Sequence, residues 1–199
     1  MSKLYYRHGT LSSGKTLALL SANHNYEQQG KNTIIFKPSI DTRSAKGKVE
    51  SRIGVSADCI DISKTFDIYK YVEAELIIKN NLSAVLVDEA QFLTTRQVEQ
   101  LKDITTKLGI PVLAYGLKNT YKPNELFEGS IALLFWADKI EELKNVCECE
   151  GCNRKATQNL YVVDGKPIYR GETVNIGDVV GEERYYSVCN YHYKNPKIN

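Results

Sequence analysis

The stretch GTLSSGKT, from Gly9 to Thr16, begins close to the start of the chain and matches the pattern Gly-x-x-x-x-Gly-Lys-Thr in full. In this pattern the glycines let backbone N–H groups face nucleotide phosphates, the lysine neutralises phosphate charge, and the hydroxyl binds Mg²⁺. A Gly/Ser-rich turn could match by chance, but a strand candidate precedes this stretch and a helix candidate follows it. We therefore expect the ATP phosphates to be bound by Gly9, Thr10, Leu11, Ser12, Ser13, Gly14, Lys15 and Thr16.

Apolar and amphipathic runs alternate on both sides of this loop. Strands are expected at residues 4–6, 32–38, 84–92 and 111–116, and helices at residues 15–29, 66–80 and 94–109. Leu17, Leu20 and His24 are expected on one side of the first helix, and Thr94 is a plausible N-cap of the third. Residues 39–58 show no clear periodicity and are expected to form a loop. The alternation predicts an α/β fold of the P-loop (RecA-like) class, with a mostly parallel sheet flanked by helices.

The run AVLVDEAQF ends an apolar strand in two acids, Asp88 and Glu89. Ligands of α/β folds bind at the carboxyl ends of the strands, so Asp88 is expected to hold Mg²⁺ together with Thr16. Glu89 is expected to take a proton, either from water in an ATPase or from a substrate hydroxyl in a kinase. The two reactions are not separated by these residues alone.

The composition narrows the choice of partners. The chain has 199 residues and a net charge of +2, without a basic tract, a signal-peptide core or an apolar run long enough to span a membrane. We therefore expect a cytoplasmic enzyme that binds neither a nucleic-acid polymer nor a membrane. The alternatives to a kinase are a P-loop ATPase or DNA-handling motor, and a nucleotide sensor without turnover.

Cysteine and histidine are concentrated near the end of the chain. Cys149 with Cys152 and Cys189 with His192 form two pairs whose spacing is typical of a tetrahedral structural zinc site, and Cys147 is a candidate to replace Cys149. Four protein ligands leave no open position on the ion, which favours a structural role over a catalytic one. Buried free thiols are the alternative.

The composition of the sequence changes near Cys147, the first of these cysteines. Turn residues become frequent and short β-like runs appear, such as NLYVVDGKPIY. We therefore expect a nucleotide-binding domain over residues 1–145, a small β-rich zinc domain over 146–194 and a flexible tail over 195–199.

Nine stretches along the chain together point to a known family: GTLSSGKT, KPSIDTR, SRIG, VDEAQF, YGL, LFEGS, ADKIEELKNVC, CNRKA and YYSVCNYH. From Gly9 to about His192 the chain resembles the zinc-carrying (type II) thymidine kinases. The resemblance implies transfer of the γ-phosphoryl group of ATP to the 5′-hydroxyl of thymidine with Mg²⁺. It also implies a homotetramer that is inhibited by thymidine triphosphate.

The resemblance also implies roles for individual residues. Glu89 matches the general base. Further nucleotide-binding positions are Asp41, Thr42, Arg43, Asp88 and Gln91, while Arg52 is a second arginine that could add charge near the phosphates. The nucleoside-binding positions are Leu11, Phe92, Leu117, Tyr121, Phe127, Ile176, Gly177 and Tyr185.

The chain departs from the family pattern in three places. Tyr121 stands where a phenylalanine is usual, the run NIGDVVGEERYY is longer than the corresponding family stretch, and the run CECEGC is longer than the usual cysteine pair. Alignment on the preceding run ELKNVC favours Cys147 as the zinc ligand, and alignment on the following run CNRKA favours Cys152. The pair spacing favours Cys149 with Cys152.

Overall fold

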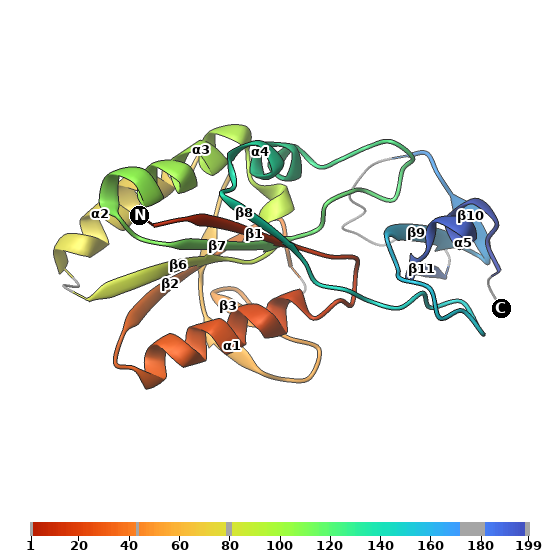
Figure 1. Cartoon of the computed structure of the whole chain (residues 1–199), viewed down its shortest axis with the longest axis horizontal. Helices are drawn as coiled ribbons and strands as arrows, with labels where there is room; N and C mark the ends of the chain where they lie inside the picture. The colour runs from red at the N-terminus through yellow and green to blue at the C-terminus, as the bar shows by residue number, and fades with distance from the viewer. Residues whose placement is uncertain (1, 43, 79–80, 172–181, 198–199) are drawn as a thin grey trace.

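A computed structural model describes residues 2–42, 44–78, 81–171 and 182–197 (Figure 1). Its largest feature is a six-stranded sheet in the order β5-β2-β6-β7-β1-β8, in which every neighbouring pair runs parallel. The strands are β1 (Leu4–His8), β2 (Asn32–Pro38), β5 (Ile60–Ile62), β6 (Leu82–Val87), β7 (Val112–Gly116) and β8 (Lys139–Glu142). The predicted α/β fold with a parallel sheet is confirmed.

Helices cover both faces of this sheet, α1 on one side and α2, α3 and α4 on the other (Figure 1). Their bounds are α1 (Lys15–Gln28), α2 (Ile68–Ile78), α3 (Thr95–Asp103) and α4 (Glu128–Trp136), with a π-helical turn at Ile104–Leu108 after α3. Side chains of β6 alternate between the two faces, because Val85 and Val87 pack toward α2–α4 while Ala84 and Leu86 pack toward α1. None of the described helices is both long and apolar enough to span a bilayer.

The third helix begins where the sequence predicts. The Thr94 hydroxyl accepts a hydrogen bond from the Gln97 N–H at 3.2 Å, and the Gln97 side chain accepts one from the Thr94 N–H at 3.1 Å. This reciprocal capping box satisfies two helix donors that otherwise lack partners. The predicted N-cap is confirmed.

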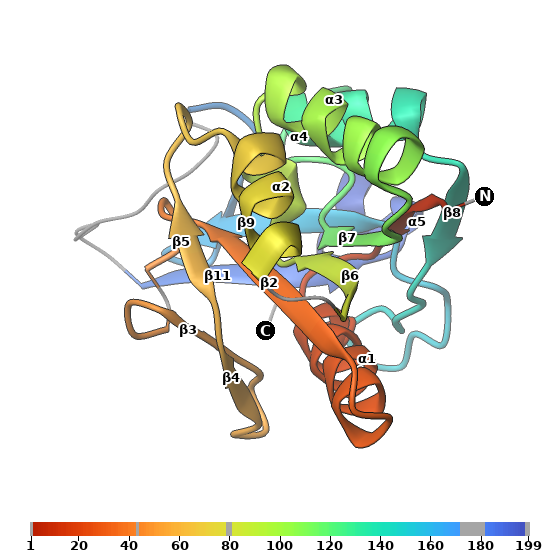
Figure 2. The ribbon, with the colours of Figure 1, turned by 90° about the vertical axis from the view of Figure 1, so that its left-hand side faces the viewer.

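Two local predictions are wrong. In α1 the buried side chains include Leu19, Leu20 and Asn23, whereas His24 is exposed, because this helix has no clear amphipathic stripe. The segment 39–58 contains an antiparallel hairpin of β3 (Lys48–Glu50) and β4 (Ser56–Asp58), which lies on the α1 side of the sheet (Figure 2). Three-residue strands are too short to produce a readable alternation.

A second, smaller sheet follows the first along the chain. It is antiparallel in the order β10-β9-β11, with β9 (Gln158–Val163), β10 (Lys166–Ile168) and β11 (Glu183–Val188), and the short helix α5 (Asn190–Lys194) follows. We call the described residues 146–171 and 182–194 the C-terminal region. It lies at the end of the molecule to which β1 and β8 lead (Figure 1), beside the loop that follows β1.

Candidate active site

The phosphate loop joins β1 to α1 and is built around two glycines. A Cβ atom on Gly9 would lie 2.6 Å from the backbone carbonyl oxygen of Leu143, which cannot rotate away as a side chain can, so only glycine fits there. Gly14 is the N-cap of α1 with a φ of 77°, a left-handed conformation that other residues rarely adopt. The buried Lys15 ammonium donates to the Thr10 carbonyl at 2.6 Å. The loop therefore holds its lysine folded across it, next to the helix N-terminus that favours anions.

Thr16 and Asp88 meet at the carboxyl end of the sheet. The Thr16 hydroxyl donates to an Asp88 carboxylate oxygen at 3.0 Å, and the Asp88 N–H donates to the carbonyl of Phe36 in the neighbouring strand β2. A hydroxyl and a carboxylate are the oxygen ligands that Mg²⁺ prefers beside nucleotide phosphates. The donor set predicted for Mg²⁺ is thus brought together, and its chemistry fits the ion.

Glu89 occupies a strained position immediately after this aspartate. Its φ is 48°, and it is only 6% exposed. The Gln91 amide donates to the Glu89 carboxylate, and its oxygen accepts from the Leu117 N–H at 2.9 Å. A non-glycine residue in the left-handed region costs of order 1 kcal/mol and is frequent at functional sites. Here the short helical turn η1 (Ala90–Phe92) and Gln91 fix the orientation of the carboxylate.

Two cavities meet at Glu89. The first, of about 580 Å³, is lined by the phosphate loop, Asp88 and the β3–β4 turn. The second, of about 730 Å³, is lined by aromatic and polar side chains that include Gln91, Asp41 and Thr42. Both cavities are lined by Leu11, Ser12, Asp41, Arg52 and Glu89. Glu89 can therefore act on groups in either one.

The second cavity collects the described residues that were expected to bind a nucleoside. Its lining includes Leu11, Phe92, Leu117, Tyr121, Phe127 and Tyr185. Phe92 and Phe127 make an edge-to-face pair with ring centroids 5.6 Å apart. Burial raises the pKa of the Tyr185 hydroxyl well above its usual value, so this ring stays neutral at physiological pH. The cavity combines aromatic and aliphatic walls with polar and charged side chains, among them Glu89, Gln91 and Asn159, which can fix the orientation of a small molecule.

The sequence reasoning missed several residues at this cavity, among them Asn159, Tyr161 and Glu183. Asn159 and Glu183 line the cavity, and the Tyr161 ring stacks on Tyr185 with centroids 4.6 Å apart. Asn159 and Tyr161 are two positions apart on β9, so they lie on the same face of the small sheet. The alternation of the run NLYVV was the available signal, but it does not reveal which face meets the cavity.

Of the two arginines expected near the phosphates, the structure describes one, Arg52. Arg52, at the turn between β3 and β4, donates to the Ser12 hydroxyl of the phosphate loop at 2.6 Å. Arg43 lies outside the described residues, as do the predicted base-binding residues Ile176 and Gly177.

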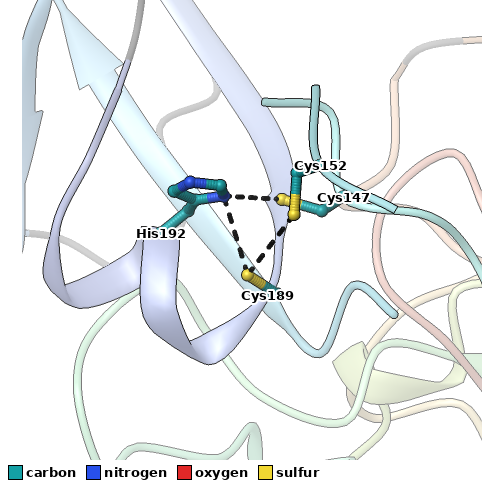
Figure 3. Close-up of side chains that lie close together, drawn as sticks. All are labelled: Cys147, Cys152, Cys189 and His192. Atoms are coloured by element: carbon teal, nitrogen blue, oxygen red, sulfur yellow. Dashed lines mark hydrogen bonds between the residues drawn. The ribbon is translucent and has the colours of Figure 1, made fainter. Parts of the chain in front are cut away.

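The cysteine cluster lies in the C-terminal region (Figure 3). The ligand atoms of Cys147, Cys152, Cys189 and His192 all lie within 4.8 Å of one another. The Cys152 and Cys189 sulfurs are 4.0 Å apart, and His192 Nδ1 is 3.3 Å from the Cys147 sulfur. A tetrahedral zinc ion, with bonds of about 2.3 Å to sulfur and about 2.0 Å to nitrogen, requires similar ligand separations. The cluster can hold zinc.

Of the two cysteines that the sequence left open, Cys147 lies in the cluster and Cys149 does not. The Cys147 N–H donates to the Arg154 carbonyl at 2.9 Å, and this short antiparallel contact brings Cys147 and Cys152 to the same place. Cys149 sits in the intervening turn, where its carbonyl accepts from the Cys152 N–H. The Cys149 side chain is buried in the same small core as Cys147 but lies outside the ligand group, and the spacing of the pairs does not reveal this.

The environment of the cluster acts on its thiols in opposite directions. Burial raises the pKa of the Cys147 thiol. Burial also acts to raise the pKa of Cys189, but hydrogen bonds from the His192 N–H, the Cys147 thiol, the Tyr191 N–H and the Cys152 thiol together more than offset it and leave that pKa lowered. Hydrogen bonds of this kind favour thiolates, the form in which cysteine binds metal.

Comparison with known proteins identifies relatives along the whole chain. A family model described as thymidine kinase matches residues 2–193. A thymidine kinase of Streptococcus pyogenes serotype M3 is 44% identical over 198 residues and covers both chains fully. One of Lactobacillus acidophilus is 44% identical over 207 residues, covering 100% of this chain and 99% of the relative. The Pif1 helicase structure from Candida albicans matches with a TM-score of 0.44 and 16% identity, covering 72% of this chain and 36% of the helicase, which is too slight to bear on function.

Proposed function

The chain belongs to the thymidine kinase family, and from this premise we propose that it transfers the γ-phosphoryl group of ATP to the 5′-hydroxyl of thymidine. The observation that best supports the proposal is the place of Glu89, which lines both cavities. A carboxylate there can accept a proton from a hydroxyl in the second cavity while the phosphoryl group arrives from the first.

The first cavity supplies the donor side of this reaction. The loop N–H groups and Lys15 bind the ATP phosphates, and Arg52 adds a cation beside Ser12. Mg²⁺ held by Thr16 and Asp88 would neutralise the charge that develops as the phosphoryl group moves. We assign Asp41, Thr42 and Arg43 to the nucleotide-binding set on the family pattern.

The second cavity supplies the acceptor side. Its aromatic walls suit a flat pyrimidine, which can stack on rings such as Phe92 or Tyr185. Leu117 and Phe127 add apolar surface, and Tyr121 adds a hydroxyl that donates to the Arg170 carbonyl at 3.3 Å. By family pattern, we assign main-chain groups near Ile176 and Gly177 to the base itself.

The proposal includes a structural role for zinc. Cys147, Cys152, Cys189 and His192 fill four positions of a tetrahedral ion and leave no site for a substrate. We propose that zinc fixes the ends of the C-terminal region, so that its strands can carry Tyr185 to the acceptor cavity.

Several features of the family stay predictions for this chain. They are a homotetramer, inhibition by thymidine triphosphate, a cytoplasmic location, and a division into domains at residues 1–145 and 146–194 with a flexible tail over 195–199. Size-exclusion chromatography with light scattering tests the first, and addition of thymidine triphosphate to the assay tests the second.

A motor or a sensor is not favoured. A sensor that does not turn over its nucleotide has no need of a buried carboxylate at a second cavity, which is where Glu89 lies. A DNA-handling motor is expected to have a basic or aromatic stretch that binds the polymer, and the sequence has no basic tract.

The decisive experiment is a nucleoside panel with γ-labelled ATP. We expect label in thymidine monophosphate and little or none in deoxycytidine monophosphate. Label transferred to no nucleoside, with ATP hydrolysed instead, would contradict the proposal. Deoxyuridine in the same panel measures how strictly the thymine methyl group is required.

A further inference from the structure

The backbone of Leu11, in the middle of the phosphate loop, is bound by side chains from far along the chain. The Leu11 N–H donates to the Asn159 side-chain oxygen at 2.9 Å. The Leu11 carbonyl accepts from the Ser187 hydroxyl at 2.6 Å and from the Asn145 side chain at 3.2 Å. The peptide groups on both sides of this residue are therefore held by side chains outside the loop.

Two of these side chains form one built surface. Asn159 on β9 and Ser187 on β11 stand opposite each other in the antiparallel ladder, so they point to the same face of the small sheet. Asn159 is 2% exposed and Ser187 is 0% exposed. Buried polar groups are retained where their hydrogen bonds are made, and here those bonds go to the phosphate loop.

Asn159 also reaches the acceptor side. Its amide nitrogen donates to the carbonyl of Asn119 at 3.2 Å, in the segment between Leu117 and Tyr121. One amide thus contacts the loop that binds the donor and the loop that lines the acceptor cavity. Because one end must accept and the other must donate, neither a carboxylate nor an apolar side chain of similar size can make both bonds.

We infer that Asn159 is a positioning residue for phosphoryl transfer, which sets the phosphate loop at a fixed distance from the acceptor cavity. The inference rests on the proposed function. It assigns Leu11 a docking role, because its N–H is committed to Asn159 and is therefore not available to a phosphate. Ser187 supports the same contact from the neighbouring strand.

The physical effect expected of such a residue is on rate more than on binding. In-line transfer requires the attacking oxygen and the γ-phosphorus to approach in a narrow geometry, and a misplacement of about 1 Å can cost roughly 10²-fold. Each substrate can still bind to its own side when the two sides shift relative to each other.

The test is Asn159→Leu, which keeps the number and branching of the side-chain heavy atoms and removes both bonds. We expect kcat for thymidine phosphorylation to fall by roughly 30- to 100-fold. The dissociation constant of a non-hydrolysable ATP analogue should stay within about threefold of wild type. The ratio of ATP hydrolysed to thymidine phosphorylated should rise, because water can reach a γ-phosphoryl group that the acceptor no longer meets.

A matched control lies next to it. Gln158→Leu removes two hydrogen bonds of similar length, to the Asn119 side chain and to Asn190, but does not touch Leu11. We expect its kcat within about threefold of wild type. Ser187→Ala is a milder variant in case Asn159→Leu does not fold, and we expect kcat to fall by roughly 3- to 10-fold, the usual effect of one lost hydrogen bond.

The outcomes separate the two proposals. If Asn159→Leu folds and its kcat matches that of Gln158→Leu, the inference is wrong. It is also wrong if Asn159→Leu does not fold and Ser187→Ala has the kcat of wild type. If the unaltered protein phosphorylates no nucleoside, the proposed function fails first and the inference fails with it.

Discussion

The parallel sheet and the C-terminal region are stabilised in different ways. The larger core cluster of the sheet buries twenty described residues, nearly all aliphatic or aromatic. The core of the C-terminal region has six buried residues, and three of them are cysteines, Cys147, Cys149 and Cys189. Such a small core supplies little hydrophobic free energy, so we expect a zinc ion bound by the cysteine cluster to contribute what the apolar side chains do not.

The residues that we propose to act in the reaction divide along the same line. The sheet and the loops at its edge carry Lys15, Asp88 and Glu89, whereas the C-terminal region carries Tyr185 and two of the residues that bind Leu11, Asn159 and Ser187. Substitutions on the sheet side should therefore lower the rate of phosphoryl transfer and leave the stability of the fold nearly unchanged. Substitutions in the cysteine cluster should first destabilise the C-terminal region and lower activity as a consequence.

The largest effect is expected from Glu89→Gln. The amide cannot accept the proton of the acceptor hydroxyl, so kcat should fall by roughly 10²- to 10⁴-fold. The melting temperature and the affinity for an ATP analogue should be nearly unchanged, because an amide oxygen can still accept from Gln91. Steady-state assays with labelled ATP measure the effect, and Glu99→Gln, at an exposed site on α3, is the control. Full activity of Glu89→Gln would remove Glu89 from the mechanism.

Loss of the metal is expected to have the next largest effect, on the other region. Cys147→Ser or a strong chelator should abolish zinc binding, which otherwise amounts to about one ion per chain. Hydrogen exchange should then accelerate in β9 and β11 while β6 and β7 remain protected, because the metal contributes folding free energy only locally.

Cys149→Ser is the matched control for this experiment. Its side chain lies outside the ligand group, so metal content should be retained. The opposite result, with metal lost from Cys149→Ser and kept by Cys147→Ser, would restore the ligand set that the pair spacing favoured.

A smaller effect is expected at the junction of the two regions. Tyr121→Phe removes the hydrogen bond from its hydroxyl to the Arg170 carbonyl and keeps the ring contacts with Tyr161 and Tyr185. The loss of one such bond should raise the KM for thymidine by roughly two- to tenfold with kcat little changed. A kcat that fell as far as in Glu89→Gln would mean that this hydroxyl acts in the chemical step.

The smallest effect concerns pH and the residue before the phosphate loop. Burial and the nearby Lys118 lower the pKa of His8, although Glu142 opposes this. A depressed histidine pKa means that the folded state favours the neutral ring, so its contribution to stability is present above pH about 6.5 and is lost as the pH falls. Urea unfolding at pH 7.5 and 5.5 should show a smaller pH-dependent loss in His8→Gln than in the unaltered protein. Equal losses would contradict this assignment.

The sheet side was largely predictable from sequence because its signals are local. The spacing of Gly9, Gly14 and Lys15 defines the loop, and apolar runs place Asp88 and Glu89 at a strand end. The helix α4 was not predicted, because its residues are apolar nearly all round and show no stripe.

The C-terminal side was predictable only in part because its contacts are between distant segments. The metal-binding residue types were evident, but the choice of Cys147 over Cys149 depends on how one turn folds. Nothing in the sequence indicates that Asn159 would meet Leu11, which is 148 positions earlier. Such pairings are set by tertiary packing and leave no periodic pattern.

The order of the strands has a consequence for how the protein is made. β1 lies between β7 and β8, and the loop after it is fastened by Asn159 and Ser187, the second of these 176 positions after Leu11. During synthesis on the ribosome, β1 therefore cannot pair with both β7 and β8 until most of the chain has been made. The phosphate loop, although it lies near the start of the chain, is therefore among the last parts to be completed. An unfinished chain lacks the hydrogen bonds from Asn159 and Ser187 that hold this loop in shape.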